Sequence, residues 1–322
     1  ERKSAQGEFK MPPRRFPNLF IIGAMKAGTS SLHEYLHQHP QIFMSRFKEP
    51  QYFAPHSTRG GLRWGQGNPC PEPGIDWYLR LFADAGDVMY AGESSVSYTA
   101  APWVTGCEKR IHAFNPDAKL IYLLRDPIER TISHYWHMVA DGREDLDLMA
   151  AVRCKEEYLA RSDYAGQLCP YLDTFGRDQL FVLTIEELMA RPNEIFGQLF
   201  SWLGVAPDFP IKCDQKFNVG SLRVRQTRRG LVRLDTLQKG WRWKKYQQYL
   251  PSAAGTLVER LTYRIVDRSA ADTQAAAAYL RPIQQRQTDA LSQLLNREFP
   301  EWTTLGGAVR HAAETKLQPG AA

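Results

Sequence analysis

The chain has 322 residues, a formal net charge of +6, 43% hydrophobic and 24% charged residues. This length suffices for one large domain with a buried core, and the composition excludes a disordered or fibrous chain. No apolar run approaches the ~20 residues that a membrane-spanning helix needs, and residues 1–15 do not have the apolar core of a signal peptide. We expect a flexible tail at 1–15, one domain at 16–305 and a second tail at 306–322.

The five cysteines are widely spaced and form no C-x-x-C pair, which argues against a metal site. The sequence also contains no N-x-[ST] acceptor for glycosylation. Both features predict reduced thiols and a cytoplasmic location, with a luminal fragment of a membrane-anchored protein as the less favoured alternative.

The first predicted strand and helix enclose a loop of small residues. An apolar run at 20–22 stops at Gly23, and apolar residues recur at helical spacing from Ser31. A strand, a glycine-rich turn and a helix together direct backbone N–H groups and a helix N-terminus at an anion. The sequence therefore predicts a phosphate-binding cradle made by Lys26, Ala27, Gly28, Thr29, Ser30 and Ser31.

The register of this cradle differs from that of ATP-hydrolysing P-loops. The Walker pattern G-x-x-x-x-G-K-[ST] places lysine directly after the second glycine. Here Lys26 precedes Gly28 by two positions, which gives G-x-x-K-x-G-T-S. A glycine turn without a ligand is the simpler alternative for this motif taken alone.

The remaining pattern alternates strands with helices. Apolar runs predict strands at 88–98, 119–126 and 179–188, the last running into an acidic turn, and a short strand or turn within 39–55. Helical periodicity predicts helices at 76–84, 105–116, 127–141, 145–160, 164–176, 192–205, 270–278 and 290–302. Residues 56–74, rich in Gly and Pro, predict a long loop. The expected fold is α/β: a single P-loop-like domain with a central parallel sheet and helices on both faces.

A second motif follows the strand at 119–126. Arg125 lies at the carboxyl end of this strand, where open α/β sheets place ligands, and Ser133 lies two helical turns further on. Either residue alone could be explained by helix capping or solvent exposure. Two matched motifs about a hundred residues apart are far more specific than one.

Together the two motifs resemble those of sulfotransferases that use 3′-phosphoadenosine 5′-phosphosulfate (PAPS). The first resembles the loop that binds the 5′-phosphosulfate and the second the motif that binds the 3′-phosphate. The similarity covers most of residues 17–205 and favours the branch of heparan sulfate sulfotransferases and their bacterial relatives. It is carried by IIGAMKAGTSSLHEYLHQHP, KEPQYF, GESSVSY, RIHAFNPDAKLIYLLRDPIERTISHY and FGRDQLFVLTIEEL.

This resemblance implies sulfuryl transfer from PAPS to a hydroxyl or amine, without a metal. It implies that Lys26 stabilises the departing phosphate and that Glu49, in KEPQYF, takes the proton of the acceptor. His56 is the rival base, and a salt bridge to a neighbouring cation is the alternative role of Glu49. A late basic loop is expected to close over the nucleotide, with Arg225 and Arg228 as candidates.

The acceptor is predicted only by class, as a small molecule or glycan. Heparan-type enzymes have lysine after the glutamate that ends the second predicted strand, and here Ser94 follows Glu93, which favours a smaller acceptor. Nine basic residues and one acid lie between Arg223 and Lys245, so an anionic partner is expected there. An ATP-dependent phosphotransferase and a non-enzymatic polyanion binder are the alternatives. No nucleic-acid-binding module is evident, and the oligomeric state is left open.

Overall fold

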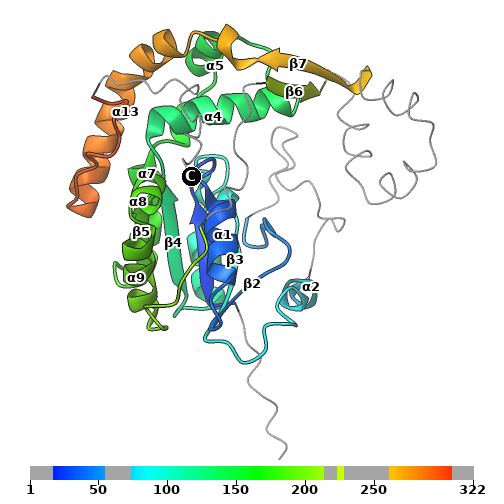
Figure 1. The fold of residues 1–322 in the computed structure, drawn as a ribbon, viewed down its shortest axis with the longest axis vertical. Helices are drawn as coiled ribbons and strands as arrows, with labels where there is room; N and C mark the ends of the chain where they lie inside the picture. The colour runs from blue at the N-terminus through cyan, green and yellow to red at the C-terminus, as the bar shows by residue number, and fades with distance from the viewer. Residues whose placement is uncertain (1–16, 55–73, 214–222, 228–260, 307–322) are drawn as a thin grey trace, which may run out of the picture.

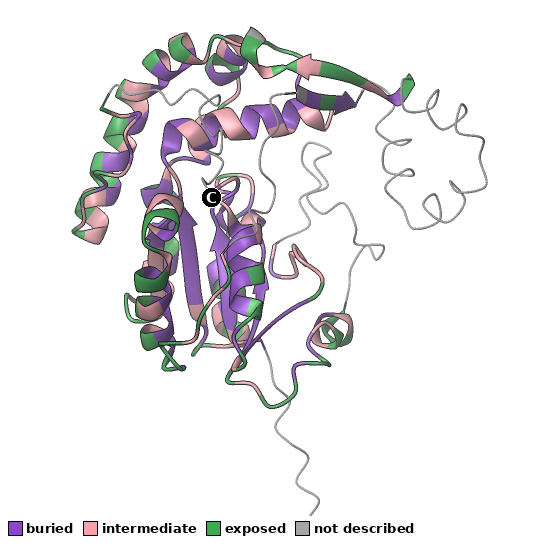
Figure 2. Cartoon of the chain, viewed as in Figure 1, coloured by how far each residue is buried: buried purple, intermediate pink, exposed green. Residues whose placement is uncertain are grey.

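The computed structural model describes residues 17–54, 74–213, 223–227 and 261–306, and its core is a parallel sheet (Figure 1). Five strands pair in the order β2-β3-β1-β4-β5, all parallel. Their bounds are β1 Leu19–Gly23, β2 Ile42–Met44, β3 Tyr90–Ser94, β4 Lys119–Leu124 and β5 Leu180–Thr184. The central strands are buried along their length because helices cover both faces (Figure 2), which is why they appear in the sequence as continuous apolar runs.

The helices are α1 Thr29–His37, α2 Ile75–Arg80, α3 Cys107–Phe114, α4 Pro127–Ala140, α5 Leu148–Cys154, α6 Glu157–Ala160, α7 Tyr164–Phe175, α8 Ile185–Ala190, α9 Pro192–Leu203 and α13 Thr273–Leu295. The 3-10 turns are η1 Val96–Thr99 and η2 Arg268–Ala270. Among these described segments, no helix has both the length and the apolar character to cross a membrane.

The strand order places a topological switch point beside β1. From β1 the chain crosses through α1 to β2 on one side, and from β3 it crosses through α3 to β4 on the other. Right-handed crossovers in opposite directions put these helices on opposite faces. Ring contacts agree, since Tyr35 of α1 meets Phe196 of α9 and His112 of α3 meets Phe175 of α7. The carboxyl ends of β1 and β4 therefore border the crevice where such sheets bind ligands.

A second hydrophobic cluster lies beyond the carboxyl end of the sheet. There α4 packs with α5, α13 and an antiparallel strand pair, β6 Arg223–Thr227 and β7 Tyr263–Asp267 (Figure 1). Val224 of β6 and Leu280 of α13 are buried members of this cluster. The late part of the chain is thereby brought over the edge at which β4 ends.

Most expected elements are confirmed, but some expectations are wrong. The single helix expected at 145–160 is two helices, α5 and α6. The acidic turn expected after β5 is α8, because the Thr184 side chain caps it and Glu187 completes the capping box. The helices expected at 270–278 and 290–302 are one helix, α13, which ends at Asn296 in a left-handed conformation. Pro282 lies within α13, so a proline did not end it as the general rule suggests. The loop expected at 56–74 falls almost wholly outside the described residues.

Gly23 and Gly86 give a test of how tightly the end of β1 is packed. Both have positive φ, but a Cβ at Gly23 would lie 2.2 Å from Thr99 Oγ1, whereas nothing lies within 4 Å at Gly86. We expect Gly23→Ala to lower the free energy of unfolding by more than ~3 kcal/mol and Gly86→Ala by about 1 kcal/mol. Urea unfolding of both variants checks this, and equal losses would contradict the packing.

Candidate active site

The turn between β1 and α1 leaves a run of backbone donors free. Gly28 precedes α1 in the left-handed conformation (φ 99°), and a Cβ there would lie 3.0 Å from Ile185 Cδ1. The N–H groups of Gly28, Thr29 and Ser30 donate to no acceptor within the described residues. Free N–H groups at the positive end of a helix dipole bind an anion readily.

Side-chain donors surround these N–H groups. The Lys26 ammonium forms no hydrogen bond or ion pair with the described residues, and its backbone is also left-handed (φ 69°). The hydroxyls of Thr29, Ser30, Ser31 and Ser133 likewise have no hydrogen-bond partner in this part of the chain. Such a set of unpartnered donors fits phosphate and sulfate groups, whose oxygens accept several hydrogen bonds at once.

Three cations face this turn. Burial lowers the pKa of Lys26, and the positive charges of Arg125 and Arg268 lower it further. The Arg125 Nη1 donates to the carbonyl oxygen of Lys26 over 3.4 Å. The cations that follow β1 and β4 therefore lie next to each other. Its Nη2 pairs with Glu129 at 2.9 Å, which leaves the cluster with an excess of positive charge. An anion placed between these cations would remove their mutual repulsion.

Arg268 is the cation that sequence reasoning missed. It opens η2, directly after β7, and its Cζ lies 5.6 Å from the centre of the Trp136 ring, one turn along α4 from Ser133. Its Nε is buried and has no hydrogen-bond partner among the residues that the structure describes. No motif marks the segment around Arg268, because its position depends on the pairing of β6 with β7.

Glu49 lies at the same edge, in the segment that follows β2. Its N–H donates to the Ser94 carbonyl over 2.9 Å, and its Oε2 accepts from the Val96 N–H over 2.9 Å. Its Oε1 forms a salt bridge with Lys48, which is the alternative role predicted for Glu49 from the sequence. Lys48 is close enough to Lys26 for its charge to lower the pKa of Lys26. Glu49 is thus fixed beside the cation cluster with lone pairs left on each oxygen.

His33 links α1 to this segment. Its Nε2 lies 3.0 Å from the Ser45 carbonyl oxygen and its Nδ1 lies 2.8 Å from the Ser94 hydroxyl. Burial lowers the pKa of His33 to about 4, and the nearby charge of Lys48 adds to this. The ring is therefore neutral at pH 7, with its proton on Nε2, because a carbonyl oxygen can only accept. The anion cradle and the Glu49 segment are joined through one side chain.

Glu93 is a buried carboxylate behind Glu49 that the sequence did not single out. It is fully buried and accepts hydrogen bonds from the hydroxyls of Tyr98, Ser95 and Tyr78. Burial raises the pKa of Glu93 to about 7, although these hydrogen bonds lower it and the charge of Glu49 raises it slightly. The signal available in the sequence was a glutamate at the end of a buried strand.

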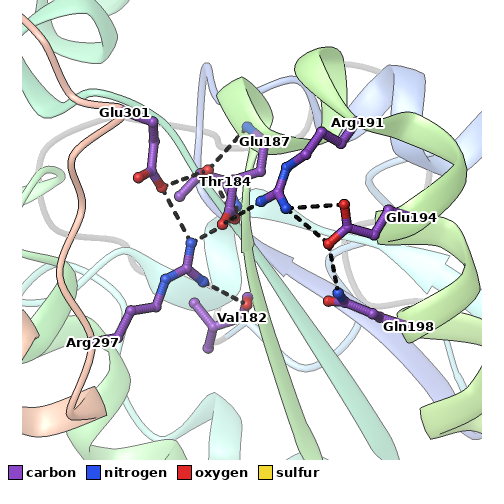
Figure 3. Close-up of polar contacts among 8 residues, drawn as sticks. All are labelled: Val182, Thr184, Glu187, Arg191, Glu194, Gln198, Arg297 and Glu301. Atoms are coloured by element: carbon purple, nitrogen blue, oxygen red, sulfur yellow. Dashed lines mark hydrogen bonds and ion pairs between the residues drawn. The ribbon is translucent and has the colours of Figure 1, made fainter.

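The turn that carries Arg125 is held by the segment after α13. Asp126 caps α4 and also accepts from the N–H and hydroxyl of Thr304, at 3.1 and 2.5 Å. Arg297 of the same segment pairs with Glu187 and Glu301 and donates to the Val182 carbonyl (Figure 3). The segment after α13 therefore links α8 to the turn at the end of β4 through hydrogen bonds and ion pairs.

The other predicted site residues are less directly placed. Ala27 is buried and its N–H donates to the Ala24 carbonyl over 3.1 Å, so its contact with a cofactor stays a prediction. Arg225 is exposed and its guanidinium lies 4.4 Å from the ring centre of Tyr263. Arg228 lies outside the described residues, as does the rival base His56. Within the described ranges, no group of three His, Cys, Asp or Glu side chains is arranged to hold a metal ion.

Comparison with known proteins decides the family. The model of the sulfotransferase family matches residues 17–209, more than half of the chain. The chain belongs to the sulfotransferase family. All of β1 to β5, both motifs predicted to bind phosphate and Glu49 fall within the matched region.

Individual relatives include enzymes named for heparan sulfate. The bifunctional heparan sulfate N-deacetylase/N-sulfotransferase 1 of Caenorhabditis elegans is 24% identical over 216 residues, which are 62% of this chain and 23% of the relative. Human heparan sulfate glucosamine 3-O-sulfotransferase 6 is 36% identical over 123 residues, 38% of this chain and 30% of the relative. The chain thus spans less than a third of the length of these two relatives.

A solved structure extends the similarity over most of the chain. The crystal structure of a sulfotransferase from Alicyclobacillus acidocaldarius superposes with a TM-score of 0.63 at 26% identity. The match covers 89% of this chain and 99% of that one. The fold of this protein is therefore the sulfotransferase fold, including the elements that follow residue 209.

The raised pKa of Glu93 predicts a pH-dependent contribution to stability. Between pH 4.5 and about 7 folded Glu93 keeps a proton that the unfolded chain releases, so this stabilisation is present at low pH and is lost as pH rises through 7. We compare the free energy of unfolding of the wild type with that of Glu93→Gln at each pH. The difference, wild type minus variant, should fall by roughly 3 kcal/mol as the pH rises across this range. Urea titrations from pH 5 to 8 test it, with exposed Glu34→Gln as the control. A constant difference for Glu93→Gln would contradict the assignment.

Proposed function

We propose that this protein transfers the sulfuryl group of PAPS to a hydroxyl or amine of a small-molecule or glycan acceptor. The observation that carries the proposal is the set of unpartnered donors between the ends of β1 and β4, in a chain of the sulfotransferase family. This family membership favours sulfuryl transfer over the phosphotransferase and polyanion-binder alternatives.

The two ends of the nucleotide have separate sites in this proposal. The N–H groups of Gly28 to Ser30, with the nearby hydroxyls and Lys26, bind the 5′-phosphosulfate. Arg125, Ser133 and Arg268 bind the 3′-phosphate, since Arg125 lies at the end of β4 and Arg268 lies against Trp136, which is one turn along α4 from Ser133. The fit rests on the free N–H groups of the turn, and on the Lys26 ammonium and the Arg268 Nε, which have no hydrogen-bond partner among the described residues.

The residues then have distinct tasks in the transfer. When bound, PAPS supplies an activated sulfuryl group, whose bond to the bridging phosphate oxygen breaks as the bond to the acceptor forms. Lys26 stabilises the negative charge that grows on this phosphate, and its buried setting strengthens the attraction. Glu49 takes the proton of the acceptor, and the hydrogen bonds to Ser94 and Val96 hold it in place.

The names of the relatives bear on the acceptor. Two of them are named for heparan sulfate and its glucosamine, so a glycan hydroxyl or amine is supported as one acceptor class. Ser94 replaces the lysine expected of heparan-type enzymes, and its hydroxyl bonds His33, so this side chain is engaged within the protein. A smaller or less sulfated acceptor therefore fits this chain better.

Nucleotide binding and product mass test the proposal together. The product nucleotide, 3′-phosphoadenosine 5′-phosphate (PAP), should raise the melting temperature in EDTA, and ATP with Mg²⁺ should not. Incubation with PAPS and a panel of hydroxyl and amine acceptors should give a product heavier by one SO₃ group. We expect Lys26→Ala and Glu49→Gln to abolish this product while the melting temperature stays near that of wild type. Stabilisation by ATP–Mg²⁺ instead of PAP would contradict the proposal.

Arg268 allows a test confined to the nucleotide. Removing one of the cations that face the 3′-phosphate should weaken PAP binding at least about tenfold, as charge-assisted hydrogen bonds are worth roughly 1.5–3 kcal/mol. Arg286→Ala, on the exposed side of α13, removes the same charge and should change the Kd less than about twofold. Isothermal titration calorimetry measures both. Equal Kd values for the two variants would remove Arg268 from the site.

A further inference from the structure

Two hydroxyls link buried Glu93 to the segment that carries Glu49. The Ser95 hydroxyl donates to Glu93 Oε2 over 2.7 Å and accepts the N–H of Gln51 over 3.0 Å. The Tyr98 hydroxyl donates to Glu93 Oε1 over 2.5 Å and accepts the N–H of Phe53 over 3.3 Å. Each hydroxyl therefore lies between the carboxylate and one backbone N–H of residues 49–53.

The direction of these bonds follows from the number of protons. A hydroxyl has one proton to donate, and a backbone N–H can only donate. Above its pKa of about 7, Glu93 is a carboxylate that can only accept, so it draws the protons of both hydroxyls toward itself. Their lone pairs are then turned toward Gln51 and Phe53. A neutral group in the place of Glu93 would not impose this order.

The segment requires such support because its backbone is unfavourable. Glu49 and Gln51 both have positive φ, at 62° and 54°, a conformation that costs a non-glycine residue on the order of 1–3 kcal/mol. Pro50, between them, has no N–H to add a hydrogen bond. The bond to Ser95 comes from Gln51 itself and the bond to Tyr98 from Phe53, two residues further on, so both fix the path of the chain at and just after the strained residues.

We propose that Glu93 is a positioning residue for the base Glu49. By taking the hydroxyl protons of Ser95 and Tyr98, it holds residues 49–53 in the strained conformation that points Glu49 at the acceptor. The inference rests on the proposed function, since it assumes that Glu49 is the base. It assigns a task to a buried carboxylate that the transfer step does not use.

Tyr78 supplies a matched control within the same cluster. Its hydroxyl also donates to Glu93 Oε1, at 3.0 Å, and it is as fully buried as Tyr98. Among the described residues it accepts no N–H from the segment 49–53. Tyr78→Phe and Tyr98→Phe each remove one hydrogen bond to the same carboxylate. Only Tyr98→Phe also removes a hydrogen bond to the backbone of residues 49–53.

Hydrogen–deuterium exchange tests the positioning without depending on activity. We expect Tyr98→Phe, Ser95→Ala and Glu93→Gln to speed amide exchange in residues 49–53 by roughly three- to tenfold, the loss of about one net hydrogen bond. Tyr78→Phe should leave this exchange at the wild-type rate. If Glu93→Gln fails to fold, the two tyrosine variants still decide the question. Equal exchange in Tyr78→Phe and Tyr98→Phe would overturn the proposal.

Kinetics then separate positioning from a general structural role. Tyr98→Phe should lower kcat about 10- to 100-fold with the KM for PAPS within about twofold, because a misplaced base slows transfer without weakening the donor site. Tyr78→Phe should keep kcat within about twofold at a similar loss of melting temperature. A fall in kcat that follows the melting temperature in both variants would contradict positioning. If wild type transfers no sulfuryl group, the proposed function fails, and the exchange measurement still decides whether Glu93 orders the segment.

Discussion

Mutual repulsion among cations at the carboxyl edge of the sheet is the constraint on which the site depends. Lys26 follows β1, Arg125 follows β4 and Arg268 follows β7. Burial lowers the pKa of Lys26 most, the charges of the two arginines lower it further, and the charge of Asp141 opposes them. Burial weakens solvent screening and strengthens this repulsion. Two hydrophobic clusters hold the elements in place against it, one around the parallel sheet and one between α4, α5, β6 and α13. The fold thus maintains an arrangement that a polyanion would relieve.

The turn proposed to bind the anion and the proposed base are built on neighbouring parts of one framework. His33 of α1 bonds Ser45, in the chain before Glu49, and Ser94, at the end of β3, so α1 is tied to both. The Glu49 N–H bonds the Ser94 carbonyl at the end of β3. A displacement of α1 would therefore move the proposed base, Glu49, together with the proposed phosphosulfate site. This coupling suits an in-line transfer, in which donor and acceptor must be held in register.

The sequence predicted the local parts of this site and missed the parts made by distant contacts. The glycine turn after β1, and Arg125 with Pro127 after β4, carry strong local signals because glycine and proline restrict the backbone. Arg268 carries none, since only the pairing of β6 with β7 brings it to α4. The task inferred for Glu93 was equally hidden, because Tyr78 and Tyr98 reach it from two separate segments. The continuity of α13 was missed because Pro282 is tolerated inside it.

A crystal structure of the full chain with PAP tests the central claim most directly. The account predicts the 5′-phosphate within hydrogen-bond distance of the N–H groups of Gly28 to Ser30 and of the Lys26 ammonium. It predicts the 3′-phosphate beside the guanidinium groups of Arg125 and Arg268. A nucleotide bound with its phosphates away from both the β1–α1 turn and the end of β4 would contradict it.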